Sequence, residues 1–375
     1  MTTLADPVEL TQILVRIDTM NPPGGEAEAA RLLGGMLAEA GFEVAYHELA
    51  PGRLGLVAGL EGEGGRPPLV MTGHLDTVPL GGAAWREQPL GGHIRGDRLY
   101  GRGSSDMKAG LAAMTVAAQA LARLPGRAGG LTLVFTAAEE TANEGARQMA
   151  AAGALPTRAG ALLVAEPSGN RPFLGHKGAL WLQVSFQGKS AHGSMPDQGV
   201  NAIYKAARAT INLEGLLNEF PPHPQLGRPT INVGTISGGT KINMVPDHAE
   251  LTLDIRTAPC QDHDDLTQQV QELVGADGLL TRLTDAPAIL TDQDDPWVRG
   301  VLGLMDQAGL PTTPGYVNYF TDASVLGQAL GKPPVMILGP GEAQLAHQTD
   351  EYCEVGKIRQ AADLYLAIAR QWSGV

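Results

Sequence analysis

The first half of the chain alternates between short apolar runs and longer helical stretches. Apolar runs at residues 69–71, 131–135 and 161–165 each end at a glycine or a polar side chain, and such runs predict buried strands. Between the first two, residues 107–124 are mostly Ala, Leu, Met and Val, which predicts a helix that is buried on most sides. Strands separated by helices are typical of a largely parallel sheet.

The middle third of the chain has a different pattern. From residue 180 to 187, apolar Leu, Val and Phe alternate with mainly polar residues, which predicts a strand with one polar face. Its other predicted elements are strands at 230–236, 249–257 and 279–284, and helices at 199–220 and 262–274. The order strand–helix–strand–strand–helix–strand indicates a small antiparallel sheet with both helices on one face.

These two patterns predict an α/β protein with two domains. A mainly parallel-sheet domain takes residues 1–177 and 288–375, and an inserted α+β domain of ferredoxin-like type takes residues 178–287. A chain of 375 residues is long for a single hydrophobic core, which agrees with this division.

Composition narrows the classes of partner. The net charge is −13 and Lys and Arg form no cluster, so neither nucleic acid nor an anionic membrane is an expected partner. The N-terminus lacks the pattern of a signal peptide, and no apolar run approaches the ~20 residues of a membrane span. Cys260 and Cys353 lie far apart and are expected to be free thiols. We therefore expect a cytoplasmic protein.

Acidic and histidine side chains follow the predicted parallel strands. His74 comes after the first strand, Glu139 and Glu140 after the second, and Glu166 after the third. The carboxyl ends of parallel strands meet at one edge of a sheet, where ligand sites of open α/β sheets lie. Imidazole and carboxylate groups bind divalent metals, so we predict a metal site at this edge.

Two aspartates have more ambiguous contexts. Asp76 lies two residues after His74 and could accept a hydrogen bond from the ring nitrogen that does not bind metal, although His-x-Asp alone is a weak signal. Asp106 stands just before the helix at 107–124. Its ordinary role there is an N-cap, but a carboxylate kept ionised by the helix dipole also suits a ligand that bridges two cations.

Seven short motifs extend this pattern along the whole chain. They are Gly-His-Leu-Asp-Thr-Val-Pro (73–79), Gly-Arg-Gly-Ser-Ser-Asp-Met-Lys (101–108), Glu-Glu-Thr (139–141), Glu-Pro-Ser (166–168), Ser-Ala-His-Gly-Ser (190–194), Asp-Ile-Arg (254–256) and Ala-His-Gln (346–348). In these motifs and their order the chain resembles the dinuclear zinc amidohydrolase and exopeptidase family. That family includes acetylornithine deacetylase, succinyl-diaminopimelate desuccinylase, aminoacylase and glutamate carboxypeptidase.

The resemblance implies a catalytic domain of the zinc-exopeptidase type with two Zn²⁺ ions. One ion would be held by His74, Asp106 and Glu166, and the other by Asp106, Glu140 and His347, with Asp106 as the bridge. Mixed histidine and carboxylate ligands with an open position suit a catalytic zinc. Cobalt and manganese suit the same ligands, so they are alternative metals.

The resemblance also assigns the catalytic roles. Asp76 would orient His74, and Glu139 would be the general base that takes a proton from water and later passes it to the departing nitrogen. The peptide bond after Asp106 would be cis.

Three residues of the insert are further candidates by resemblance. His192 would hold the oxyanion in the partner subunit's site, with the insert forming the interface of a homodimer. Arg256 would clamp a substrate carboxylate, and a salt bridge to Asp254 or Asp247 is its plainer alternative. Asn243 would hydrogen-bond the substrate.

The expected function is hydrolysis of the amide bond of N-acyl-L-amino acids by a zinc-bridged hydroxide. The alternatives are a glutamate-releasing carboxypeptidase or dipeptidase, acting on short peptides with the same site, and a non-catalytic metal-binding protein. Glu166, where dipeptidases and aminopeptidases usually have Asp, favours the deacetylase, desuccinylase and glutamate carboxypeptidase branch. Phe320 stands where desuccinylases carry small residues, which argues against recognition of a dicarboxylate acyl group.

Overall fold

The computed structural model describes residues 5–375, and the chain divides into two compact units. The first comprises the residues up to Gly175, Thr291–Gly315 and Thr321–Val375, and the second comprises His176–Leu290 and Tyr316–Phe320. The sequence did not predict that the short segment Tyr316–Phe320 belongs to the second unit, because it has no periodicity of its own. Within residues 5–375, no helix is both long and apolar enough to cross a membrane.

A mixed sheet forms the centre of the first unit. Within the first unit its strand order is β1-β2-β6-β3-β7-β15-β8. The bounds are β1 (Glu43–Ala50), β2 (Arg53–Leu60), β3 (Arg66–His74), β6 (Gly129–Thr136), β7 (Ala161–Val164), β8 (Phe173–His176) and β15 (Val335–Ile337). Two further short strands, β13 (Ile289–Leu290) and most of β14 (Gly315–Val317), belong to the residues of the second unit. Strands β6, β3 and β7 are parallel neighbours, as the apolar runs predicted, and β15 pairs with β7 in the same direction. This α/β fold is confirmed.

The register of these strands aligns their carboxyl ends. His74 at the end of β3 lies opposite Thr136 at the end of β6, and Thr72 lies opposite Val164 of β7. Every residue of β6 and β7 is buried, which explains why both strands are continuously apolar rather than alternating. Residues that follow β3, β6 and β7 therefore emerge at one edge of the sheet.

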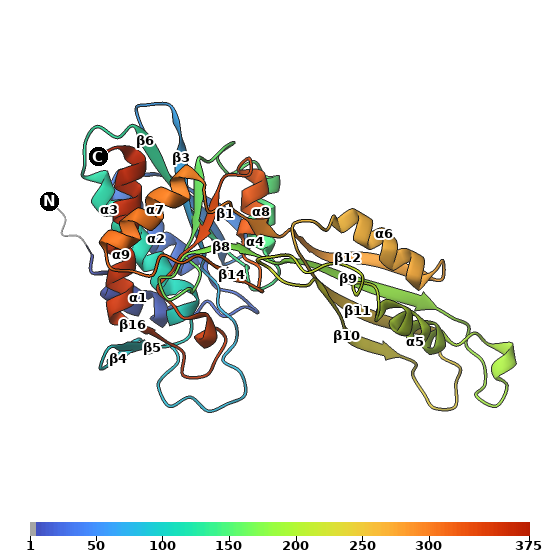
Figure 1. Ribbon diagram of the computed structural model, residues 1–375. Coiled ribbons are helices and arrows are strands. Elements are labelled where there is room, and N and C mark those ends of the chain that lie inside the picture. The colour runs from blue at the N-terminus through green and yellow to red at the C-terminus, as the bar shows by residue number, and fades with distance from the viewer. Residues whose placement is uncertain (1–4) are drawn as a thin grey trace. The chain divides into compact units, whose positions relative to one another are not determined.

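The helices of the first unit form two groups. Helices α1, α2, α3, α7 and α9 pack on one another and α4 packs on α8, and Figure 1 shows the two groups on opposite sides of the sheet. Their bounds are α1 (Pro7–Arg16), α2 (Ala27–Glu39), α3 (Ala109–Ala122), α4 (Glu144–Ala151), α7 (Pro296–Gln307), α8 (Ala323–Ala329) and α9 (Val355–Ser373). Small residues at most positions of α3 allow its burial beneath α9. A separate three-stranded sheet contains β4 (His93–Arg95), β5 (Arg98–Tyr100) and β16 (Tyr352–Glu354).

The second unit is a four-stranded antiparallel sheet with two helices. The sheet order is β10-β11-β9-β12, and the elements are β9 (Gly178–Gln187), α5 (Ala202–Leu213), β10 (Thr230–Gly238), β11 (His248–Thr257), α6 (His263–Val274) and β12 (Gly278–Ala286). Apolar residues of β9 and β11 form one core with those of α5 and α6. The predicted inserted α+β fold is confirmed. Helix α5 is shorter than the predicted 199–220, because Asn201 caps its start and the helix ends at Leu213, two residues before Gly215, a poor helix former.

His176, the last residue of β8, is fully buried, and we expect its protonation to make the stability of the protein depend on pH. Its Nδ1 lies 2.8 Å from the Lys177 carbonyl oxygen, and its Nε2 has no hydrogen-bond partner. Burial lowers its pKa to about 4, so the unfolded chain binds more protons than the native protein between pH 6.5 and 4. Stability therefore falls as the pH falls through this window, by about 3 kcal/mol at pH 4.

Replacement of this side chain tests that expectation. His176→Phe keeps a ring in the core but has no group to protonate. Its free energy of unfolding, measured by urea denaturation at equal metal content, should decline less than that of the wild type between pH 6.5 and 4. Equal declines in the two proteins would show that His176 does not contribute.

Candidate metal centre and active site

The candidate ligands come from loops at the carboxyl edge of the parallel strands. His74 ends β3, Glu140 follows β6 by four residues and Glu166 follows β7 by two. His347 lies beyond β15, in a loop after a short 3-10 turn at Ala343–Leu345, and has a positive φ of 63°. His74 thus stands on a buried strand, and Glu140, Glu166 and His347 stand on loops that follow buried strands, an arrangement that fixes ligand positions.

Asp106 stands in a tight turn before α3. The N-cap position of α3 is Lys108, and Asp106 has extended dihedral angles (φ −123°, ψ 92°). Asp106 is therefore not the N-cap of this helix, which was its ordinary alternative role. The Asp106–Met107 peptide bond is cis, as the resemblance implied.

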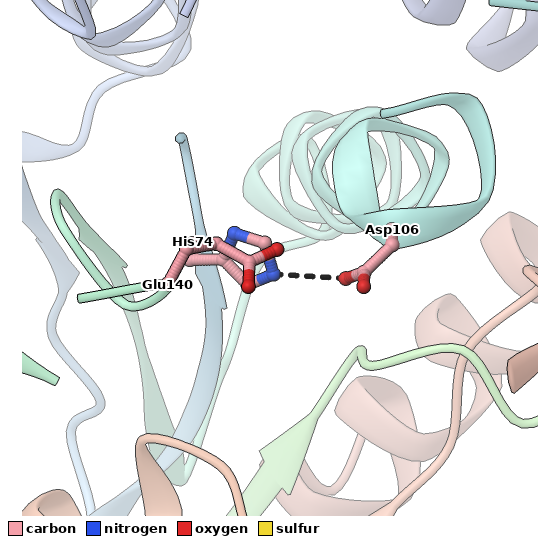
Figure 2. Close-up of side chains that lie close together, drawn as sticks. All are labelled: His74, Asp106 and Glu140. Carbon is pink, nitrogen blue, oxygen red and sulfur yellow. Dashed lines mark hydrogen bonds and ion pairs between the residues drawn. The ribbon is translucent and has the colours of Figure 1, made fainter. Parts of the chain in front are cut away.

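The structure brings the two histidines to opposite oxygens of Asp106. Nε2 of His74 lies 2.9 Å from Oδ1, and Nε2 of His347 lies 3.5 Å from Oδ2. His347 Nε2 is also 3.0 Å from Glu140 Oε1, and His74 Nε2 is 3.8 Å from Glu166 Oε1. Potential ligand atoms of His74, Asp106 and Glu140 all lie within 4.8 Å of one another, and Figure 2 shows these three side chains together.

The histidines and carboxylates shift one another's pKa. Hydrogen bonds with Asp106 and Glu140 raise the pKa of His347 to about 10. Burial lowers the pKa of His74, but the charges of Glu166 and Asp106 outweigh burial and hold it well above its usual value. Burial also disfavours ionisation of Asp106, yet hydrogen bonds with His347 and His74 leave its pKa below the usual value.

The pKa values of the neighbouring glutamates are raised, whereas that of Asp106 is lowered. Burial is the main reason why the pKa values of Glu139, Glu140 and Glu166 are raised, and repulsion between the carboxylates adds to the shift. Several buried carboxylates at one place are costly without a compensating charge. A pair of divalent cations would supply that charge, so the donor set fits two metal ions in both chemistry and electrostatics.

The expected hydrogen bond between the Asp76 carboxylate and His74 is not formed. Nδ1 of His74 lies 2.8 Å from the main-chain carbonyl oxygen of Asp76, whereas Asp76 Oδ1 is 3.7 Å away. The carboxylate instead accepts hydrogen bonds from the backbone N–H groups of Glu139 (3.0 Å) and Glu140 (3.3 Å) and from Asn21 (2.9 Å). Asp76 therefore orients His74 through its backbone, while its side chain fixes the turn that carries the two glutamates.

Glu139 is buried beside the candidate ligands. Its Oε1 accepts a hydrogen bond of 3.2 Å from Nδ2 of Asn143, which also donates to Asp322 at 2.8 Å. Thr136 donates to the other oxygen of Asp322. The sequence analysis did not predict roles for Asn143 and Asp322, although Asn143 lies two residues after the motif at 139–141 and Asp322 two residues after Phe320.

His192 and Asn243 lie on neighbouring exposed loops of the second unit. His192 pairs with Met244 in an isolated bridge, and Gly193 N–H donates to the carbonyl of Asn243 at 2.8 Å. The His192 ring is 2.7 Å from the Ser194 hydroxyl. The two predicted residues are thus close to one another.

Arg256 is paired within the second unit. Its Nε lies 2.8 Å from Asp254 Oδ1 and its Nη2 donates to Asp254 Oδ2 at 3.1 Å. The guanidinium carbon is 5.4 Å from the ring centre of Phe320 and 6.0 Å from that of Trp181. The salt bridge to Asp254, the plainer of the two expectations, is formed, and Nη1 remains the nitrogen without a bond to Asp254.

Two histidines and several carboxylates thus gather at the carboxyl edge of the parallel strands, and this donor set suits divalent metal ions. Residues 70–371 match the model of peptidase family M20/M25/M40, and the chain belongs to this family. The family consists of hydrolases that act on amide bonds, so the protein is an enzyme of that kind.

Proteins similar in sequence include some that are named as two kinds of deacylase. The chain is 32% identical to acetylornithine deacetylase of Photorhabdus laumondii over 340 residues, which cover 87% of this chain and 86% of the relative. It is 28% identical to a probable succinyl-diaminopimelate desuccinylase of Staphylococcus aureus over 359 residues, with 82% and 84% covered.

Solved structures share the fold along the whole chain. An M20-family metallo-carboxypeptidase from Sulfolobus solfataricus matches with a TM-score of 0.80 and 17% identity, covering 99% of this chain and 100% of that one. A dinuclear metal-binding peptidase of the M20 family from Bacillus subtilis matches with a TM-score of 0.73 and 15% identity, covering 98% of each chain.

Proposed function

We propose that the protein is a dinuclear metal-dependent amidohydrolase that removes the acyl group from N-acyl-L-amino acids. The observation that carries the proposal is Asp106, whose two carboxylate oxygens face two different histidines, His74 and His347. A carboxylate placed in this way suits a bridge between two cations. The relatives named acetylornithine deacetylase support the choice of substrate class.

The side chains divide into two ligand sets around that bridge. His74, Asp106 and Glu166 would hold one ion, and Asp106, Glu140 and His347 the other. Zinc is the proposed metal, with cobalt and manganese as alternatives that the same ligands accept. Bound divalent ions supply Lewis-acid chemistry that makes water acidic near neutral pH and polarises a carbonyl group.

Glu139 is the proposed general base. Its carboxylate is buried and is held by Asn143 rather than by a histidine. Burial raises its pKa, which suits a group that must take a proton from the attacking water and then release it to the departing amine nitrogen. The turn that carries Glu139 is fixed by Asp76, so the carboxylate is positioned before substrate arrives.

Residues of the second unit are proposed to complete the site. His192 would donate a hydrogen bond to the oxyanion of the tetrahedral intermediate. Arg256 would bind the substrate carboxylate through Nη1, and Asn243 would hydrogen-bond the substrate. We also propose that the protein is a homodimer in which His192 serves the site of the partner subunit.

A carboxypeptidase or dipeptidase is the second candidate function. The structural relatives include a metallo-carboxypeptidase and a tripeptidase, and the same ligands and base would serve both reactions. Both cleave an amide beside a carboxylate, so the two functions differ in the group that is released.

A substrate panel tests the proposal. Zinc-loaded protein would be incubated with N-acetyl, N-succinyl and N-formyl amino acids, γ- and α-glutamyl compounds and dipeptides, and the released amines identified by mass spectrometry. We expect chelator-sensitive release from N-acyl amino acids. Release from peptides or glutamyl amides alone would move the protein to the peptidase function, and no release from any member would contradict both.

A further inference from the structure

Glu351 is a buried acid close to the candidate metal centre in sequence and in space, yet no motif assigns it a role. It follows His347 by four residues, immediately before β16. Its side chain is completely buried, as is that of its ion-pair partner Arg102, whose Nη1 lies 2.6 Å from Oε2. The pair needs an explanation, because burial of two charges seldom stabilises a fold by itself.

The Glu351 carboxylate accepts hydrogen bonds from the backbone of the turn that carries Asp106. Oε1 accepts from the N–H groups of Ser105 (2.8 Å) and Asp106 (3.0 Å), and Oε2 accepts from Gly103 N–H (3.0 Å). Together with the guanidinium of Arg102, each oxygen therefore receives two N–H donors. Since its oxygens are occupied in this way, Glu351 is unsuited to be a metal ligand itself.

The same contacts join the segment of Asp106 to the segment of His347. Strands β5 and β16 pair with each other, and Tyr100 lies opposite Tyr352. The next residue, Gly101, continues this pairing, since its N–H donates to the Glu351 carbonyl oxygen at 2.9 Å. Arg102 reaches in the other direction and donates to the carbonyl oxygen of Gln348 at 3.2 Å. The two segments that carry facing ligands are therefore bound to each other by reciprocal side-chain contacts.

We propose that Glu351 is a positioning residue of the metal centre, which sets the backbone of Asp106 relative to His347. This inference rests on the proposed two-metal site. The Asp106 oxygens must face two directions at once, so a small rotation of the turn at residues 103–106 would weaken both ligand sets. Partners that orient metal ligands are typically worth 10–100-fold in metal affinity or activity.

Glu351→Gln is the main test. Glutamine has the same shape, but it has one carbonyl oxygen for four N–H donors, and its NH₂ group would oppose N–H groups that now face Oε2. Metal would be removed from the purified protein and Zn²⁺ and Co²⁺ added back in competition with a coloured chelator. We expect about 10–100-fold weaker binding, together with a changed visible absorption spectrum of the bound Co²⁺.

Two further variants separate positioning from general stability. Arg102→Lys loses the planar guanidinium that contacts both Glu351 and Gln348, so it should also weaken metal binding. This variant replaces Glu351→Gln in the test if Glu351→Gln does not fold. Asp285→Asn is the matched control, because it removes a carboxylate that bonds His263 and Arg282 in the second unit. It should lower the melting temperature and leave the metal affinity and Co²⁺ spectrum unchanged.

The outcomes are distinguishable. If Glu351→Gln, or Arg102→Lys in its place, folds and binds both metals with the affinity and Co²⁺ spectrum of the wild type, the positioning role is wrong while the two-metal site stands. If the wild type itself binds neither ion, the proposed function fails, and this inference fails with it.

Discussion

Glu139→Gln is expected to lower kcat by about 10²–10⁴-fold while two metal ions remain bound. The amide has nearly the same size and can still accept the hydrogen bond from Asn143 Nδ2, but it cannot take a proton from water. The metal ligands are other side chains, so the metal content should be unchanged. Turnover of an N-acetyl amino acid and metal content by mass spectrometry are the two measurements.

Glu144→Gln is the control for that substitution. Glu144 lies five residues further on, is exposed, and begins helix α4, so its replacement should leave kcat unchanged. If Glu139→Gln retained near wild-type turnover, the general base would be another group. If it lost its metal instead, Glu139 would be a ligand.

Asp106→Ala is expected to remove both metal ions and to bring activity below detection. Asp106 is the only group of the site whose two oxygens face the two histidines, at 2.9 Å from His74 and 3.5 Å from His347. Each ion would lose one anionic ligand, and the two remaining ligand sets would have no common member. Metal content would be measured after desalting, with activity measured with and without added Zn²⁺.

The effect of Asp106→Ala must be separated from loss of the fold. Asp277→Ala is the matched control, because Asp277 is exposed. Within residues 5–375 its single ion pair is with Lys205, at 3.1 Å. Circular dichroism should show the same helix content for both variants. An Asp106→Ala protein that kept two ions per chain after desalting would exclude Asp106 as the bridge.

Local patterns in the sequence predicted much of the architecture. The apolar runs before His74 and Glu166 form β3 and β7. They were predictable because strands buried on both faces are continuously apolar. Alternation in β9 predicted the sheet of the second unit for the opposite reason, since only one face of that strand packs on the helices.

Contacts between distant residues were not predictable from local patterns. Asn143 and Asp322 are 179 residues apart, and Asp106 and Glu351 are 245 residues apart, so no spacing rule connects them. The partner of Asp76 was also mispredicted. The His-x-Asp spacing brings the main-chain carbonyl of Asp76, rather than its carboxylate, next to the His74 ring.

Anomalous diffraction from crystals grown with Zn²⁺ tests the central claim most directly. We predict two strong peaks in the first unit, with the Asp106 carboxylate between them. His74 and Glu166 should contact one ion, and Glu140 and His347 the other. A single peak, or peaks away from these five side chains, would contradict the two-metal site and the mechanism that depends on it.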